Sequence, residues 1–144
     1  MKLSLGVWDL PYTDTVAKGE TTGEVAEVLE RKYHIMQHFA EMHQQDITKA
    51  LAFAFSGAIG NVVAGLDPMD ALKAGYMEAS SEVNTAFKQF LDRKEMDGVV
   101  GGVPTKASLE GRSSRFKNGK KGAPRPSFID TGLYSASMTS ELKE

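Results

Sequence analysis

The stretch Ala50–Leu66, ALAFAFSGAIGNVVAGL, decides the fold, because seventeen consecutive residues carry no charged side chain. A membrane-spanning helix needs about 20 strongly apolar residues, whereas this stretch is shorter, rich in Ala and Gly, and contains Asn61. It also has no flanking Trp or Tyr and no cluster of basic residues on one side, which membrane spans commonly carry. We therefore expect a helix that is buried or lies in a contact between subunits, and no membrane span.

Small side chains leave much of this helix backbone bare. They are Ala54, Gly57, Ala58, Gly60, Ala64 and Gly65. Each Gly inside a helix costs about 0.5–1 kcal/mol relative to Ala, and such a cost is better tolerated where another helix packs closely against the gap. Two interpretations are open: the helix that packs against this one belongs to another subunit, or it belongs to the same chain. In both, this helix is central to the structure.

Helical periodicity continues upstream of this stretch. Thr21 and Glu24 have the spacing of a capping box, in which a hydroxyl and a carboxylate each satisfy a free backbone amide. Apolar residues then recur at helical spacing, at Val25, Val28, Leu29, Met36, Phe39 and Ala40. The pattern predicts one helix from residue 24 to about 42 and a second from 47 to about 63, with one long bent helix as the alternative.

A third helix starts at Asp67-Pro68, since Asp is a preferred N-cap and Pro is favoured at the first helical position. Its broad apolar face leads to an end near Asp97-Gly98. At the N-terminus, residues 2–12 alternate loosely between apolar and polar, and Pro11 ends a short strand or extended arm. Residues 105–109 have the length of one helical turn.

These elements predict a mainly α fold. We expect a bundle of about three helices with a short N-terminal strand or arm and an extended basic C-terminal arm; the alternative class is α+β. The chain divides into an N-terminal arm and loop (1–23), a helical body (24–98) and a basic C-terminal arm with a terminal motif (99–144).

The charges are unevenly distributed. The chain has 144 residues with 17 basic and 19 acidic side chains, a net charge of −2. Six basic residues and no acidic one lie between positions 112 and 125, so the remaining 11 basic and 19 acidic residues give the rest of the chain a net charge of −8. The basic segment is defined by Arg112, Arg115, Lys117, Lys120, Lys121 and Arg125.

Three interpretations of the basic segment are open: it binds nucleic acid, it lies on an acidic protein surface, or it is a solvated loop. Basic side chains neutralise phosphates and give salt-dependent affinity. Phe116 is its one aromatic residue, however, and single-strand binders stack bases on several aromatic rings. We favour an acidic protein surface, with DNA as a partner only if the segment faces a channel.

Nothing in the sequence indicates an enzyme. The chain has no cysteine, no G-x-S-x-G elbow, no phosphate-binding loop and no dinucleotide fingerprint. His34 and His38 are four residues apart on a predicted helix, with Glu41 and His43 nearby, but a zinc-protease motif needs Glu where Ile35 stands. We expect no catalytic residue, no metal site and no cofactor.

Trp8 is a candidate for partner binding. Tryptophan is enriched among the residues that contribute most to protein interfaces, and Trp8 follows the N-terminal apolar alternation. The other interpretation is a contact within the core of the same chain.

The segment 125–138, RPSFIDTGLYSASM, is the most distinctive part of the sequence. It resembles the motif P-L-x-x-T-G-x-L-x-x-S-I/F of tailed-phage virion-morphogenesis and tail-completion proteins. Phe128, Thr131 and Gly132 stand at matching positions, and Leu133 follows the glycine one position earlier than in that family. A helical region and a basic loop precede the motif in that family, as they do in this chain.

The resemblance implies a non-enzymatic protein of the phage neck or tail that works as a ring of copies. Its partners would be further copies of itself and other neck, portal or tail proteins. Its location would be the virion, assembled in the cytoplasm of the host bacterium. Two alternatives stay open: another tail or baseplate component, and a small nucleic-acid-binding accessory protein for DNA packaging.

Overall fold

The computed structural model describes residues 2–13, 20–112, 122–129 and 132–143. Six helices and two strands follow one another along these residues. They are β1 (Lys2–Val7), α1 (Thr22–Tyr33), α2 (Ile35–Met42), α3 (Gln44–Val63), α4 (Pro68–Asp92), α5 (Lys106–Leu109), α6 (Leu133–Ala136) and β2 (Met138–Lys143). The predicted mainly α fold with a short strand is confirmed.

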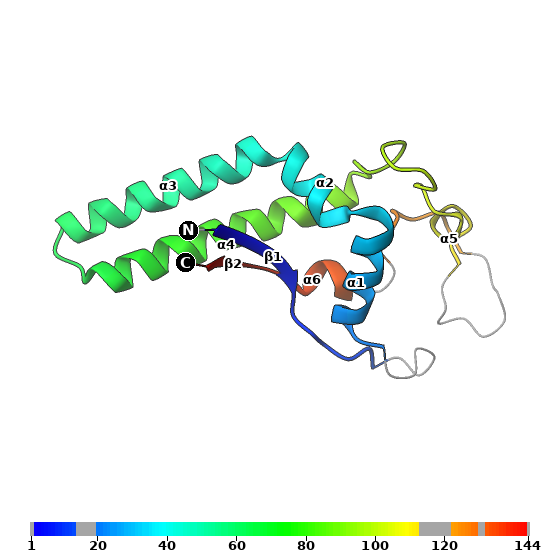
Figure 1. Ribbon diagram of the computed structural model, residues 1–144, viewed down its shortest axis with the longest axis horizontal. Helices are drawn as coiled ribbons and strands as arrows, with labels where there is room; N and C mark the ends of the chain where they lie inside the picture. The colour runs from blue at the N-terminus through cyan, green and yellow to red at the C-terminus, as the bar shows by residue number, and fades with distance from the viewer. Residues whose placement is uncertain (1, 14–19, 113–121, 130–131, 144) are drawn as a thin grey trace.

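A long antiparallel hairpin of α3 and α4 forms the frame of the molecule (Figure 1). The buried residues of α3 are Ala50, Ala54 and Ala58. On α4 the small buried residues Ala71, Gly75 and Ala79 have the same four-residue spacing. A Cβ atom at Gly75 would lie 2.7 Å from the carbonyl oxygen of Ala54, so the two backbones are in direct contact there.

The caps predicted from the sequence are confirmed. The Asp67 carboxylate accepts hydrogen bonds from the backbone amides of Met69 (2.9 Å) and Asp70 (3.2 Å) at the start of α4. At the start of α1, the Thr21 hydroxyl accepts from the Glu24 amide, and the Glu24 carboxylate accepts from the Thr21 amide. These bonds satisfy amides that have no partner inside the helix.

The helix expected over 24–42 is instead two helices. His34 has a φ of 51° in the left-handed region, where it ends α1 and precedes α2. The carboxylate of Glu30 accepts from the amides of Met36 (2.8 Å) and Gln37 (3.2 Å), so one side chain of α1 caps the first turn of α2. Periodicity did not indicate this break, because Leu29 of α1 and Met36 of α2 keep the seven-residue helical spacing across it.

The two following helices also differ in their bounds. α3 begins at Gln44, earlier than the expected Ile47, directly after His43 ends α2. α4 ends at Asp92 instead of near Asp97-Gly98. Lys94 has a φ of 59°, and this left-handed residue prevents the helix from continuing.

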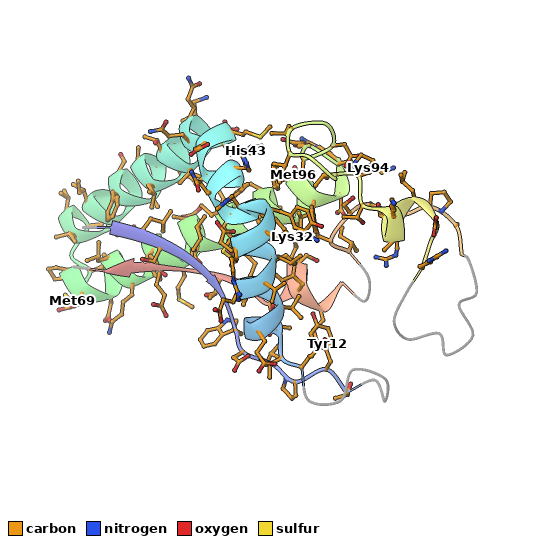
Figure 2. All side chains as sticks on the ribbon, turned by 45° about the vertical axis from the view of Figure 1, so that its right-hand side comes forward. Tyr12, Lys32, His43, Met69, Lys94 and Met96 are labelled. Atoms are coloured by element: carbon orange, nitrogen blue, oxygen red, sulfur yellow. The ribbon has the colours of Figure 1, made fainter. Side chains whose placement is uncertain are left out.

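The hydrophobic core lies at the α1–α2 end of the hairpin. Phe39 of α2 contacts Phe87 and Phe90 of α4, with ring centroids 5.2 and 5.5 Å apart, and Phe87 contacts Tyr134 of α6 at 6.1 Å. Met96 and Met138 belong to the same buried cluster. Figure 2 shows Met96 at this end of the molecule and Met69 at the opposite, free end of the hairpin.

The two ends of the described chain form an antiparallel ribbon that lies along α4 (Figure 1). β1 pairs with β2 from Lys2↔Lys143 to Val7↔Met138. Tyr76 donates a hydrogen bond to the backbone carbonyl of Ser140, and the hydroxyls of Ser80 and Ser140 are 2.7 Å apart. The two terminal segments, expected as an N-terminal strand or arm and an extended C-terminal arm, are therefore paired with each other within one chain.

Replacement of Gly75 by Ala tests the close contact between the hairpin helices. The new Cβ would overlap the Ala54 carbonyl, so we expect a loss of about 1–3 kcal/mol in the free energy of unfolding, measured by urea denaturation of dilute protein. Gly57→Ala on α3 is the matched control, because nothing lies within 4 Å of a Cβ there, and we expect a gain of about 0.5–1 kcal/mol. Equal effects of the two substitutions would contradict this packing.

Candidate interaction surface

The side of α3 that faces away from α4 is apolar and uncovered. Its central residues are Ser56, Ile59, Gly60 and Val63, spaced i, i+3, i+4 and i+7, and we call them the outer face. Ile59 is 67% exposed and Val63 is 83% exposed. A helix with apolar residues on several sides is normally buried, yet in the described part of the chain the buried residues of α3 are the three alanines of one side.

The structure supports packing within one chain for the alanines of this helix, and contact of its glycines with another subunit stays a prediction. Ala54 and Ala58 pack against α4, so the helix that covers the alanines belongs to the same chain. Gly57 and Gly60 point elsewhere, and a Cβ atom at either would meet nothing within 4 Å. The contact inside the chain thus accounts for the alanines but leaves these glycines without a packing partner among the described residues.

An open groove lies on the far side of α4, between that helix and β2. Its volume is about 540 Å³. Trp8 and Met77, 62% and 71% exposed, are its large apolar residues. The Asn84 side-chain oxygen, in the same lining, is buried and has no hydrogen-bond partner among the described residues.

Trp8 is held by its backbone while its ring stays in solvent. Its amide donates to the carbonyl of Ser137 at 2.7 Å, and its carbonyl accepts from the Thr22 hydroxyl at 2.5 Å. The interpretation of Trp8 as a core residue is therefore wrong. The prediction that Trp8 binds a partner is compatible with this exposure and stays a prediction.

The basic segment lies mostly outside the described residues: Arg115, Lys117, Lys120 and Lys121 all fall there. Arg112 forms an ion pair with Glu110 at 2.5 Å. Arg125 donates to the backbone carbonyls of Arg112, at 2.7 Å, and of Ile129. The two described arginines of the segment thus fasten its ends to the same chain, and its partner stays a prediction.

The terminal motif is built into the fold. Phe128 packs on the ring of Tyr33, with centroids 5.0 Å apart. Gly132 has a φ of 79° and directly precedes α6, which begins at the half-buried Leu133. Thr131 lies outside the described residues. Phe128 and Gly132 therefore have roles within this chain, and whether the motif also contacts a partner stays a prediction.

The histidines do not converge on a common centre. Within the described residues, no group of three or more His, Cys, Asp or Glu side chains has the arrangement of a metal site. His38 lies 4.0 Å from Glu41. His34 sits at the break between α1 and α2.

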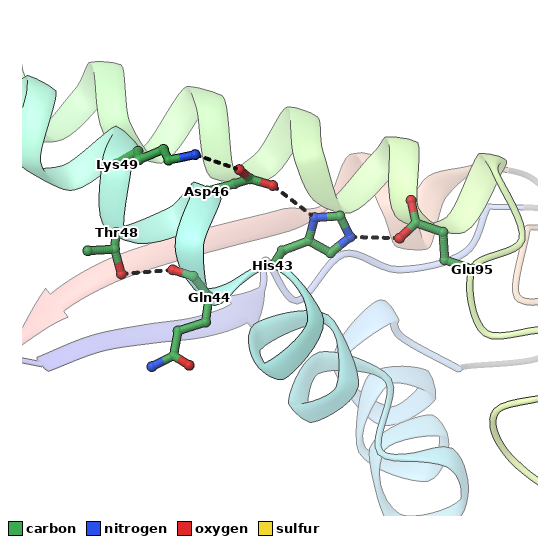
Figure 3. A network of polar contacts seen from close by, with 6 residues as sticks. All are labelled: His43, Gln44, Asp46, Thr48, Lys49 and Glu95. Carbon is green, nitrogen blue, oxygen red and sulfur yellow. Dashed lines mark hydrogen bonds and ion pairs between the residues drawn. The ribbon is translucent and has the colours of Figure 1, made fainter.

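His43 instead connects two distant parts of the chain (Figure 3). Its Nε2 lies 2.8 Å from the Glu95 carboxylate, and its Nδ1 lies 3.6 Å from that of Asp46. The ring packs against Phe39 and Phe90 at centroid distances of 5.2 and 5.7 Å. This network fixes the start of α3 against the segment that follows α4.

The sequence does not predict this network: His43 stands beside the His34 and His38 pair, and residues 43–46 fall between the two expected helices. The i, i+3 spacing of His43 and Asp46 was the available signal. Glu95 lies 52 residues away from His43 in sequence, and no local pattern connects them.

Searches with the sequence and with the fold found no matching family model, curated protein or solved structure. Among the helices that the structure describes, none is long and apolar enough to cross a membrane. The candidate surface therefore has to be interpreted from its own geometry and chemistry.

Replacement of Tyr134 by Phe tests the buried end of the motif. The Tyr134 hydroxyl has no hydrogen-bond partner among the described residues, and burial, with Glu30 nearby, raises the pKa of Tyr134 far above 10. The unfolded chain ionises this group above about pH 10 while the folded chain does not, so wild-type stability falls as the pH rises past that value. The Phe variant has no hydroxyl to ionise at this position, so its free energy of unfolding lacks this pH dependence.

We expect Tyr134→Phe to change the free energy of unfolding by less than about 1 kcal/mol near pH 8, because no hydrogen bond is lost. Above pH 10 we expect the free energy of unfolding of the variant to rise relative to that of the wild type by about 1.4 kcal/mol per pH unit. Urea denaturation at both pH values measures this difference. An advantage that did not grow with pH would contradict the burial of the hydroxyl.

Proposed function

We propose that this chain is a structural protein of a tailed-phage virion and works as a homo-oligomeric ring in the neck, at tail completion between head and tail. The uncovered outer face of α3 carries the proposal. Ile59 and Val63 lie in solvent on a helix that has no charge from Ala50 to Leu66. The proposal assigns no catalytic residue and no cofactor to the chain.

The physical support is the cost of leaving this surface in water. Monomeric proteins rarely expose contiguous apolar patches larger than a few hundred Å², and each Å² removed from water contributes about 25 cal/mol. A 20-residue helix such as α3 is about 30 Å long, comparable to a small domain. One side of such a helix would supply part of the area of about 800 Å² that each partner buries in a stable interface.

The phage assignment rests on the resemblance of residues 125–138 to the tail-completion motif. The charge distribution supports assembly as well, because a body of net charge −8 and a segment of charge +6 in every copy are complementary between copies. Another position in the tail or baseplate is the alternative within this class. The alternative of another class is a nucleic-acid-binding packaging accessory protein.

Replacement of Ile59 by Asp tests self-association. We expect the wild type to form a closed oligomer in size-exclusion chromatography with light scattering, and Ile59→Asp to be monomeric, because it places a charge in an apolar contact. Val28→Asp is the matched control, since Val28 is also exposed (53%) but lies on α1. We expect it to assemble normally. A wild type that stays monomeric at every concentration would contradict the proposal.

The virion assignment is tested by where the protein is found. We expect mass spectrometry to detect it in purified phage particles in a fixed ratio to the portal protein, and the flanking reading frames to encode portal, capsid or tail proteins. Absence from the particles would contradict the assignment. Retention on heparin or DNA resin that is lost steeply with added salt, together with that absence, would favour the nucleic-acid-binding alternative.

A further inference from the structure

The outer face of α3 and the groove beside α4 lie on opposite sides of the hairpin. With about 3.6 residues per turn, residues nine positions apart point in opposite directions. Ala54, which packs against α4, and Val63 of the outer face are nine positions apart on α3. Gly75, which packs against α3, and Asn84 of the groove are nine positions apart on α4.

The two surfaces also differ in shape and in composition. The outer face is one side of an exposed helix with the spacing by which amphipathic helices dock into grooves. The groove is concave, with a volume of about 540 Å³, and presents Trp8 and Met77. At Gly60 the outer face has no side chain, and nothing lies within 4 Å of a Cβ there; we call this gap between the neighbouring side chains the notch.

A ring needs two such surfaces. A closed ring of more than two copies uses a head-to-tail contact, in which one patch of each copy meets a different patch of the next. A twofold contact, by contrast, uses one patch twice and stops at a dimer. Resting on the proposed function, we infer that the outer face of α3 in one copy docks into the Trp8 groove of the next copy.

In this contact the exposed Trp8 ring packs against the bare backbone at Gly60, between the side chains of Ile59 and Val63. Tryptophan and methionine are enriched at the centres of protein interfaces.

The chemistry favours a second copy over nucleic acid as the occupant. The outer face has no charged residue with which to meet phosphates. Among the charged residues of the groove lining, Lys88 is accompanied by Glu141. The uncharged outer face adds no charge to the groove, whose lining carries one basic and one acidic residue, so no net charge is left unbalanced in the contact.

Mixing two assembly-defective variants tests the inference. We expect Trp8→Ser and Ile59→Asp each to be monomeric in light scattering, while keeping the wild-type circular dichroism spectrum, because both side chains are exposed. An equimolar mixture should form a dimer and nothing larger. The Trp8→Ser chain supplies an intact outer face and the Ile59→Asp chain an intact groove, so one contact forms and no ring closes.

The outcomes separate this inference from the proposed function. If the wild type and Trp8→Ser both form rings, or if the mixture gives no dimer, the inference is wrong while ring assembly stands. If the wild type itself never assembles, both are wrong. A ring that persists with Trp8→Ser but not with Ile59→Asp would assign the second surface to a place other than the groove.

The notch at Gly60 provides a second test with a matched control. Gly60→Leu fills the notch and should weaken self-association by about 30-fold or more. Gly57→Leu introduces the same side chain on the same helix, equally free of contacts within 4 Å, but on the side next to the outer face. We expect it to change the dissociation constant less than about threefold. Equal effects of the two leucines would overturn the placement of Trp8.

Discussion

Where α3 lies along α4, the carbonyl of Ala54 faces Gly75 at a separation that leaves no room for a Cβ atom. This close approach sets the geometry of the whole molecule. Ile47, near the start of α3, packs against the core. Farther along, the two helices meet through alanines and one glycine, and large apolar side chains such as Ile59 and Val63 do not pack against α4. They are directed to the other sides of the helix, and the hairpin extends beyond the aromatic core as a slender, largely uncovered element (Figure 1).

On the opposite side of α4, the ribbon of β1 and β2 likewise leaves a large apolar side chain in solvent. Pairing of the two terminal segments places β2 along α4, where Ser140 meets Tyr76 and Ser80. A two-stranded ribbon is only marginally stable alone, so these contacts with the helix are needed to hold it. The same arrangement fixes the backbone of Trp8 beside the groove while leaving its ring in solvent.

Part of the candidate surface could be predicted from residues alone. The charge-free stretch around Ile59 indicated a helix with packing partners, and the enrichment of tryptophan at interfaces made Trp8 a candidate for partner binding. The groove could not be predicted, because its lining comes from Trp8, from α4 and from β2, which are distant in sequence. The contact of His43 with Glu95 was hidden for the same reason.

The sequence by itself determined the helical class, the caps at Thr21 and Asp67, and the lack of charge along α3, because each depends on neighbouring residues or on spacing within one helix. Only the tertiary structure decided which small residues are used inside the chain. Ala54 meets α4 while Gly60 remains open, a distinction set by the rotation of α3 about its axis. That rotation follows from the packing against α4, which no periodicity within α3 specifies, because apolar residues lie on several sides of the helix from Ala50 onward.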